Sequence, residues 1–225
     1  MGALTVQPHW ESLTPATREA FNLLPVFDFI SQYYLAGGTG LALHLGHRIS
    51  VDLDLFCAQP DAVNPVERSA MRTIFDDPTI SIVYDKDSTF VANWRGVGVS
   101  FFRLNLYPLV TPTVLIDGVP LASVEEIGAM KLAAIIDRGT RKDLIDLYYI
   151  LQQVNLENIF EVAATKYAKI GTFAVSATRA LAYFNEAEAL PMPRMLDKTP
   201  WSKMKKFLNA IAIEAGRKRL EDLWR

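Results

Sequence analysis

The stretch that decides the fold is Leu35–Phe56, which reads LAGGTGLALHLGHRISVDLDLF. Its apolar start belongs to a predicted short strand, Tyr33–Ala36, which leads directly into a pair of glycines. We expect Leu41–Leu45 to form a short helix and Ile49–Phe56 to form the next strand. The stretch therefore predicts a compact strand–helix–strand unit with a glycine turn after its first strand.

Two aspartates stand in the second of these strands. Asp52 and Asp54 are two residues apart, so their carboxylates are expected on one face of the strand. The same alternation predicts Val51, Leu53 and Leu55 on the opposite, buried face. Adjacent carboxylates repel each other, and Mg²⁺ relieves this while binding the phosphates of a substrate. The pattern therefore predicts a site for Mg²⁺, or Mn²⁺, at Asp52 and Asp54.

The glycine turn predicts a phosphate site beside these aspartates. Gly37 and Gly38 let the backbone come close to a ligand, and the following helix presents free N–H groups and the positive end of its dipole. The Thr39 hydroxyl can donate one more hydrogen bond. Each feature alone also fits a purely structural turn or an edge strand. Together, separated by thirteen residues, the glycines and aspartates predict a site that holds a nucleoside triphosphate (NTP) through its metal.

The pattern resembles that of the DNA polymerase β-like nucleotidyltransferase superfamily. The fuller string, from Gly37 through Arg48 and Ser50 to Asp54, is similar to that of the AbiEii/AbiGii toxin nucleotidyltransferase family. The resemblance implies an α/β (α+β) fold, with a mixed β-sheet flanked by helices and then a C-terminal helical lobe. Arg48 fits the motif either as a phosphate ligand or as the partner of an acid, and Ser50 as a further binding residue.

The same resemblance implies an activity and its partners. The activity is Mg²⁺-dependent transfer of a nucleotidyl group from an NTP to an acceptor hydroxyl, and the acceptor stays open between a tRNA end and a protein. The family supplies toxins of toxin–antitoxin and phage-defence systems, which implies a cognate antitoxin protein.

A second block of charged residues lies between residues 123 and 147. Lys131 and Arg138 are seven residues apart in one predicted helix and share a face, and Asp143 and Asp146 share a face of the next. Such a cationic face neutralises the charge that develops in phosphoryl transfer. The resemblance implies that Lys131 holds the triphosphate, and Arg138, on the same helix face, is expected to add positive charge there. It implies that Asp143 or Asp146 supports this lysine or acts on the acceptor.

One departure from the superfamily pattern concerns a third carboxylate, which these enzymes often place on a later central strand. The candidate strand, Val97–Leu109, contains Arg103 and Asn105 but no acid. Either two carboxylates suffice, or Asp143 or Asp146 substitutes, or catalysis is impaired. The alternative to an enzyme is therefore a catalytically impaired module that binds nucleotide or another protein.

The rest of the chain predicts a β-rich middle and a helical end. The strands are expected at Ile80–Tyr84, Thr89–Asn93, Val97–Leu109, Val114–Ile116 and Val119–Leu121, the last two joined by an Asp117-Gly118 turn. One helix is expected to begin after Thr14-Pro15 and to break at Pro25, and another to run from a Ser123–Glu126 capping box to Asp137. Further helices are expected at Lys142–Gln153, Glu157–Ala168, Thr172–Phe184 and Trp201–Trp224. We expect a nucleotidyltransferase core at 1–121 and a helical lobe at 122–225 that completes the active-site cleft.

Composition and charge limit the class of protein. The chain has 225 residues, half of them apolar, a single cysteine, no signal-peptide pattern and no stretch approaching the ~20 apolar residues of a membrane span. A cytoplasmic protein without disulfides is therefore expected. The net charge of −2 combines a +5 segment at 194–225 (nine Lys and Arg, four Asp and Glu) with −7 over 1–193 (fourteen and twenty-one). The basic segment is either a solvated helix face or a contact surface for a polyanion.

Overall fold

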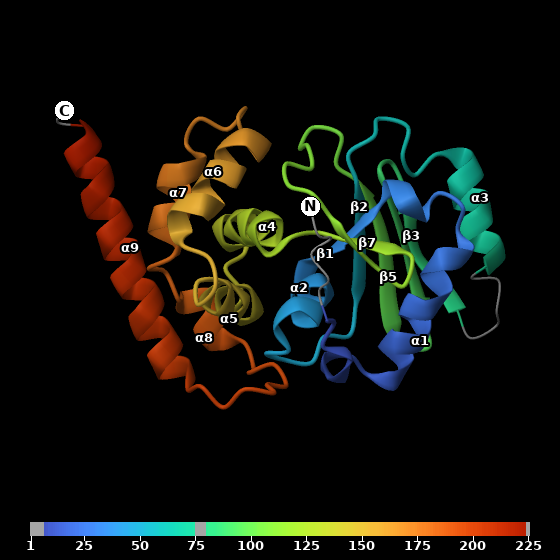
Figure 1. Cartoon of the computed structure of the whole chain (residues 1–225), viewed down its shortest axis with the longest axis horizontal. Helices are drawn as coiled ribbons and strands as arrows, with labels where there is room; N and C mark the ends of the chain where they lie inside the picture. Colours follow the sequence, from blue (N-terminus) through green and yellow to red (C-terminus); the bar gives the residue numbers. More distant parts are fainter. Residues whose placement is uncertain (1–6, 75–79, 224–225) are drawn as a thin grey trace. The chain divides into compact units, whose positions relative to one another are not determined.

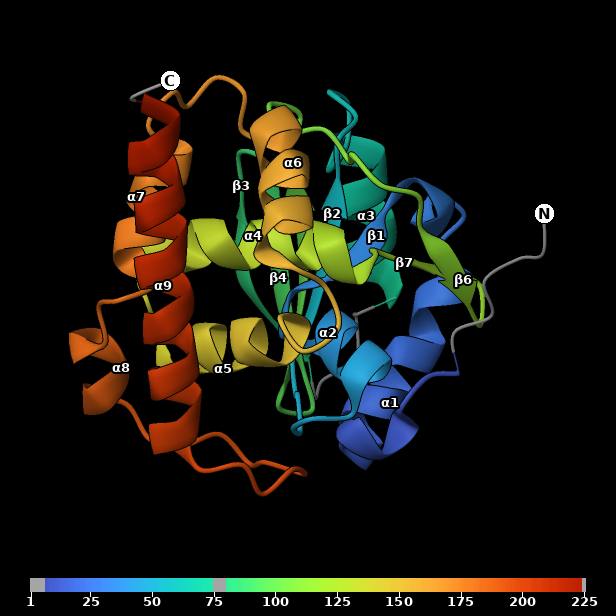
Figure 2. The ribbon, with the colours of Figure 1, turned by 60° about the vertical axis from the view of Figure 1, so that its left-hand side comes forward.

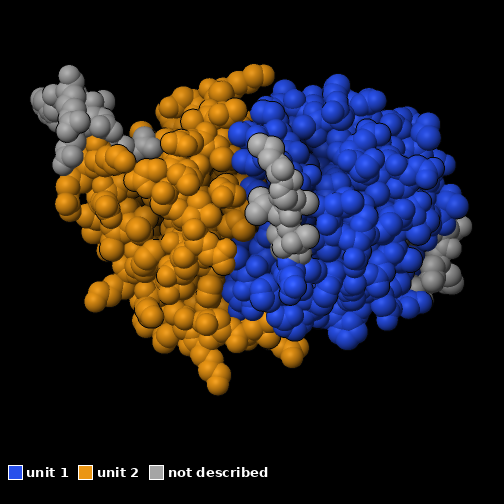
Figure 3. Space-filling model, in the orientation of Figure 1, with its two compact units in different colours: residues 1–123 blue, residues 124–225 orange. Residues whose placement is uncertain are grey.

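The structure is a computed structural model that describes residues 7–74 and 80–223. The chain divides into two compact units, residues 1–123 and 124–225 (Figures 1 and 3). The predicted helix end at Trp224 lies outside the described residues. No helix in the described ranges has the length and apolar character needed to cross a lipid bilayer.

The first unit is built on a mixed seven-stranded sheet, which confirms the predicted α/β class. Its strand order is β3-β4-β5-β2-β1-β7-β6; the β2–β5 and β1–β7 pairs are parallel and the others antiparallel. The strands are β1 (Tyr34–Ala36), β2 (Leu53–Cys57), β3 (Ile80–Lys86), β4 (Thr89–Trp94), β5 (Val97–Arg103), β6 (Val114–Ile116) and β7 (Val119–Leu121). The central strand, β2, is therefore paired on both sides.

The predicted start of the second strand is wrong. Strand β2 begins at Leu53 instead of Ile49, and Val51 is 41% exposed instead of buried. The reason is a pairing with the N-terminal segment, because the Ser50 N–H donates to the carbonyl oxygen of Ser12 at 2.9 Å. Leu53 and Leu55 are fully buried, as the alternation predicts.

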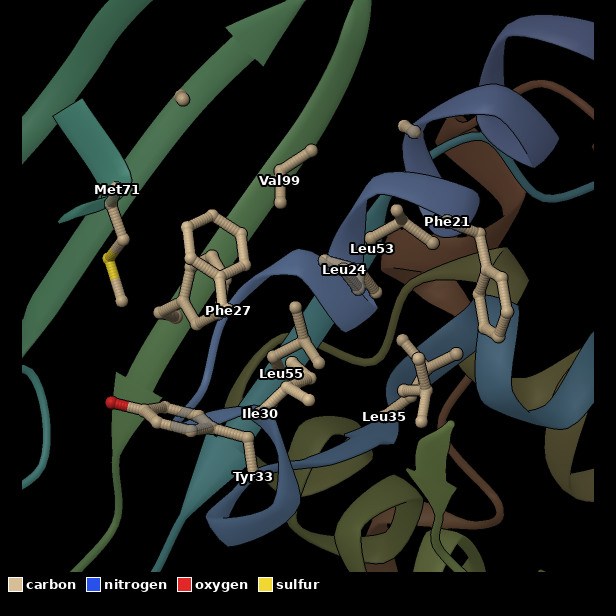
Figure 4. Close-up of a cluster of buried hydrophobic side chains, with 14 of the residues drawn as sticks. Phe21, Leu24, Phe27, Ile30, Tyr33, Leu35, Leu53, Leu55, Met71 and Val99 are labelled. Carbon is tan, nitrogen blue, oxygen red and sulfur yellow. The ribbon is translucent and has the colours of Figure 1, made fainter. Parts of the chain in front are cut away.

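Helices and 3-10 turns cover one face of the sheet and close the core. Helix α1 (Pro15–Leu23) is capped by Thr14, whose side chain accepts from the Thr17 N–H at 3.1 Å. The predicted break at Pro25 is confirmed, since α1 ends at Leu23 and 3-10 turns follow at Leu24–Val26 and Ile30–Gln32. Helix α3 (Pro65–Ile74) packs Met71 into the same cluster. Figure 4 shows the buried side chains, which include Phe21, Leu24, Phe27, Ile30, Tyr33, Leu35, Leu53, Leu55, Met71 and Val99.

The helix after the glycine turn is longer than predicted. Helix α2 (Gly37–Leu45) begins at Gly37 instead of Leu41, so the glycine pair forms its first turn. It ends at Leu45 and is capped by Gly46, which has φ +59° and donates its N–H to the carbonyl oxygen of Ala42 at 2.8 Å.

The β-meander β3–β4–β5 and the hairpin β6–β7 are confirmed. Asp117 and Gly118 both have positive φ, +46° and +86°, as a two-residue hairpin turn requires. Strand β5 ends at Arg103 instead of Leu109, because Leu104 and Tyr107 close a turn in which the Tyr107 N–H donates to the Leu104 carbonyl at 2.9 Å.

The second unit is helical, as predicted (Figure 2). Its helices are α4 (Val124–Asp137), α5 (Arg141–Ile150), α6 (Leu156–Lys166), α7 (Phe173–Ala180), α8 (Asn185–Ala189) and α9 (Trp201–Leu223). Helix α4 packs against α5, α6 and α7, and α9 packs against α5 and α7. The helix predicted at Thr172–Phe184 corresponds to α7, which ends earlier, at Ala180, and α8 was not predicted. The aromatic residues of α9 take part in packing: Phe207 contacts Tyr148 edge to face at 5.3 Å between ring centroids.

Candidate active site

The glycine turn lies directly against one of the two predicted metal ligands. Ala36, the last residue of β1, pairs with Asp54 on β2. A Cβ atom added at Gly37 would lie 2.7 Å from Oδ2 of Asp54, and Gly37 has φ +64°. Both the space and the backbone conformation therefore require glycine at this position. Gly37 and Gly38 are themselves half-buried, so part of the turn is exposed to solvent.

The second glycine faces two further predicted binding residues. A Cβ atom at Gly38 would lie 2.5 Å from Nη2 of Arg48 and 3.1 Å from Oγ of Ser50. Arg48 is buried, and its Nη1 donates to the carbonyl oxygen of Ile49 at 3.2 Å. The structure thus brings a guanidinium group to the first turn of α2, where the helix dipole already favours an anion.

The Thr39 hydroxyl is hydrogen-bonded within the protein and does not point toward solvent. It donates to the carbonyl oxygen of Asp52 and lies 2.9 Å from the Ser50 hydroxyl, and the residue is buried. This side chain therefore connects α2 to the segment that precedes β2. A phosphate contact by Thr39 remains a sequence-based prediction.

The other predicted metal ligand, Asp52, lies before β2 and is exposed. Its Oδ1 accepts a hydrogen bond from the Gly98 N–H of β5 at 3.3 Å. Asp54 pairs with Ser100, two residues further along β5. Because Gly98 and Ser100 share a face of that strand, both carboxylates lie over the same face of the sheet.

Strand β5 contributes no third acid to this face. Asp54 is opposite Ser100, and the next pair along, Phe56 and Phe102, stack with ring centroids 5.1 Å apart. Within residues 7–74 and 80–223, no three His, Cys, Asp or Glu side chains come together as a metal-binding group. Two carboxylates beside a glycine turn fit Mg²⁺ or Mn²⁺, because Mg²⁺ takes one or two protein carboxylates and completes its coordination with phosphate and water.

The second unit brings the other predicted residues together in one buried network. Nζ of Lys131 on α4 lies 3.0 Å from Oδ1 of Asp143 and 2.6 Å from Oδ2 of Asp146, both on α5. All three side chains are buried. The charge of Lys131 is therefore compensated within the unit by two carboxylates.

Asp143 also binds Arg138 and Thr140. The Arg138 guanidinium donates from Nε to Oδ2 at 2.9 Å and from Nη2 to Oδ1 at 3.2 Å, and the Thr140 hydroxyl donates at 2.6 Å. Burial alone would raise the pKa of Asp143, but the Arg138 hydrogen bonds, the Lys131 charge and the Thr140 hydrogen bond together lower it to about 2. The side chain of Arg138 is 59% exposed and that of Lys131 only 8%, so Arg138 is the accessible cation of the two.

Two features of the structure have no signal in the sequence. Gly98 carries no motif of its own, and only the β2–β5 pairing brings it to Asp52. Glu126 of α4 forms an ion pair with Lys166 of α6 at 2.8 Å, and both side chains are fully buried. A capping-box pattern accounted for Glu126 locally, and its distant partner gave no sequence signal.

A mixed sheet with a glycine turn against an aspartate is the arrangement that the sequence predicts for a nucleotidyltransferase. The chain belongs to the nucleotidyl transferase AbiEii toxin family of type IV toxin–antitoxin systems, whose sequence model matches residues 21–222. The predicted family resemblance is thereby confirmed.

The chain is also similar to one sequence relative and to two solved structures. An uncharacterized protein of Aquifex aeolicus (strain VF5), aq_aa25, is 30% identical over 174 residues, which cover 76% of this chain and 82% of the relative. Among solved structures, MenT4, the nucleotidyltransferase toxin Rv2826c of Mycobacterium tuberculosis H37Rv, matches with a TM-score of 0.59 at 16% identity, covering 88% of this chain and 85% of that one. JHP933 of Helicobacter pylori matches with a TM-score of 0.51 at 17% identity, covering 95% and 100%. The two structural matches show a shared fold.

Proposed function

We propose that the protein transfers a nucleotidyl group from an NTP to an acceptor hydroxyl in a reaction that depends on Mg²⁺ or Mn²⁺ and releases pyrophosphate. The observation that carries this proposal is the approach of Gly37 to Asp54, where a Cβ atom would lie 2.7 Å from the carboxylate. A phosphate-binding turn and a metal-binding carboxylate thus adjoin each other, as an NTP bound through its metal requires.

In this proposal each residue of the first unit has one role. Asp52 and Asp54 would hold the metal, which would neutralise phosphate charge and activate the attacking hydroxyl. The N–H groups of the first turn of α2 bind phosphate oxygens, and Arg48 beside Gly38 adds a positive charge there. Ser50 and Thr39 fix the segment that leads into Asp52.

The second unit supplies the remaining proposed roles. Arg138 is exposed and planar, and it suits direct contact with phosphate oxygens. Lys131, which the family resemblance assigns to the triphosphate, is surrounded by two carboxylates and is better suited to fixing the α4–α5 pair. Asp143 accepts from three donors and has a low pKa, which makes it a weak base. Asp146 is fully buried and paired with Lys131, so both aspartates are better suited to orienting this lysine.

The acceptor and the partners are also proposals. We propose a tRNA end or a protein as the acceptor and the cytoplasm as the location. The assignment to a type IV toxin–antitoxin family supports a cognate antitoxin as the regulating partner. The basic helix α9, with exposed Lys203 and Lys206, is consistent with an RNA acceptor.

The decisive experiment incubates the protein and Mg²⁺ with each labelled NTP in turn, adding either total tRNA or protein extract. We expect label transfer with at least one NTP, and none with an Asp52→Ala/Asp54→Ala variant. If wild type and variant both fail to transfer label under every condition, the enzyme proposal is wrong.

The second candidate, an impaired nucleotide-binding module, is favoured by one observation, namely that strand β5, the candidate for the strand that often bears a third carboxylate in the superfamily, contains no acid. Calorimetry separates the two candidates. Tight binding of an NTP with Mg²⁺ but no turnover would support the module.

A further inference from the structure

We infer that Gly98 is a positioning residue that fixes the carboxylate of Asp52 for metal binding. The inference rests on the proposed function, because it takes Asp52 to be a metal ligand. Gly98 belongs to β5, 46 residues away from Asp52 in the sequence. It would act only through Asp52, without touching the NTP or the acceptor.

The first observation is that both the backbone carbonyl and the side chain of Asp52 accept hydrogen bonds. It precedes β2 and so lies outside the regular strand, and its side chain is exposed. Its carbonyl oxygen accepts from the Thr39 hydroxyl, and its Oδ1 accepts from the Gly98 N–H at 3.3 Å. A hydrogen bond to an ionised carboxylate is stronger than a neutral one, so the Gly98 N–H favours one orientation of an otherwise exposed side chain.

The second observation is that Asp52 occupies the space that a side chain at position 98 would need. A Cβ atom there would lie 2.8 Å from Oδ1, 3.5 Å from Cγ and 3.8 Å from Cβ of Asp52. The nearest of these distances is shorter than real Cβ atoms tolerate. Any larger residue at this position must therefore push the Asp52 carboxylate away from β5.

The third observation is that the backbone gives no reason for glycine here. The described glycines with positive φ are Gly37, Gly46, Gly96, Gly118 and Gly139, and Gly98 is not one of them. It pairs regularly with Asn93 of β4 inside the meander. Glycine inside a strand costs about 0.5–1 kcal/mol relative to alanine, so a purely structural position would favour replacement. Glycine at position 98 is explained by the Asp52 carboxylate, which occupies the space that a side chain there would fill.

These observations predict opposite effects on stability and on metal binding. Gly98→Ala relieves the entropic cost of glycine, so its melting temperature should equal or exceed that of the wild type. The same change should weaken metal binding about tenfold or more, since the loss of a residue that orients a metal ligand typically costs 10–100-fold.

The experiment titrates Mn²⁺ into full-length wild type and Gly98→Ala, with and without ATP, and follows free Mn²⁺ by electron paramagnetic resonance. The matched control is Gly171→Ala, because a Cβ atom there meets nothing within 4 Å and the backbone φ is not positive. We expect the control to bind like the wild type. Equal Mn²⁺ affinity of Gly98→Ala and wild type would overturn the inference and leave the proposed function intact. Failure of the wild type itself to bind Mn²⁺ would instead overturn the proposed metal site, and the inference with it.

A second variant covers the case in which Gly98→Ala lowers the melting temperature. The clash involves the Asp52 side chain, so the double variant Asp52→Ala/Gly98→Ala should recover the lost stability. No recovery would mean that Gly98 serves the fold independently of Asp52, which contradicts the inference.

Discussion

The Nζ atom of Lys131 lies 2.6 Å from Oδ2 of Asp146, and both side chains are buried. A buried ammonium group is expensive unless it is paired, and a buried carboxylate likewise loses stability when its ammonium partner is removed. The residue that the family pattern assigns to the substrate is therefore also a central element of the second unit. Its substitution should affect stability as well as activity.

Lys131→Met should destabilise the protein by about 3–5 kcal/mol, because it leaves two buried carboxylates without their ammonium partner. Urea unfolding measures this difference. Lys142→Met is the control, since Lys142 is exposed, and it should change stability by about 0.5 kcal/mol or less. A Lys131→Met variant as stable as the control would show that the network contributes little.

Arg138→Gln should separate activity from stability. The Arg138 side chain is largely exposed, so we expect a stability loss clearly smaller than that of Lys131→Met, together with a raised KM for the NTP. Steady-state kinetics at saturating Mg²⁺ give the KM. An unchanged KM would remove Arg138 from the proposed phosphate contacts.

The low pKa of Asp143 predicts a loss of stability in acid. Its value in the folded protein is about 2, against an ordinary 3.8, so its contribution is present above pH 4 and disappears as the pH falls toward 2. The shift corresponds to about 2 kcal/mol. The free energy of unfolding should therefore fall more steeply between pH 4 and 2 in the wild type than in Asp143→Asn. Parallel curves for the two proteins would contradict this prediction.

Gly37→Ala should impair both the fold and the site. The positive φ of Gly37 costs a residue with a Cβ atom about 1–2 kcal/mol, and the new methyl group would displace the Asp54 carboxylate. We expect a lower melting temperature and at least a tenfold loss of nucleotidyl transfer. Gly171→Ala again serves as the control, and normal transfer by Gly37→Ala would contradict the proposed geometry.

The buried pair Glu126–Lys166 should behave differently when one or both partners are removed. Lys166→Met alone leaves a buried carboxylate and should cost about 3–5 kcal/mol. The double variant Glu126→Leu/Lys166→Met should be close to the wild type in stability. Urea unfolding of all four proteins in the double-mutant cycle tests this, and additive losses would rule out the coupling.

The parts of the fold that depend on local chemistry could be predicted from the sequence. The β6–β7 hairpin follows from Asp117-Gly118, and the start of α1 follows from Thr14-Pro15. The start of β2 could not be predicted, because it is decided by the hydrogen bond between Ser50 and Ser12, residues far apart in the sequence.

The same distinction applies to the candidate site. Gly37 and Asp54 belong to one local sequence motif, and its spacing was enough to predict that they lie close together. The Gly98–Asp52 hydrogen bond requires the parallel pairing of β2 and β5, and the position of Lys131 between two aspartates requires the packing of α4 against α5. Sequence spacing places such residues on a face but does not identify the partner across it.

The position of β2 in the middle of the sheet has a consequence for how activity is lost on denaturation. Its amide groups are paired with β1 on one side and β5 on the other, so they should exchange with deuterium only when the whole first unit opens. Asp54 therefore stands on one of the slowest-exchanging segments of the chain. Heating or denaturant should abolish activity in a single step with the loss of the first unit, without a loosened, partly active form.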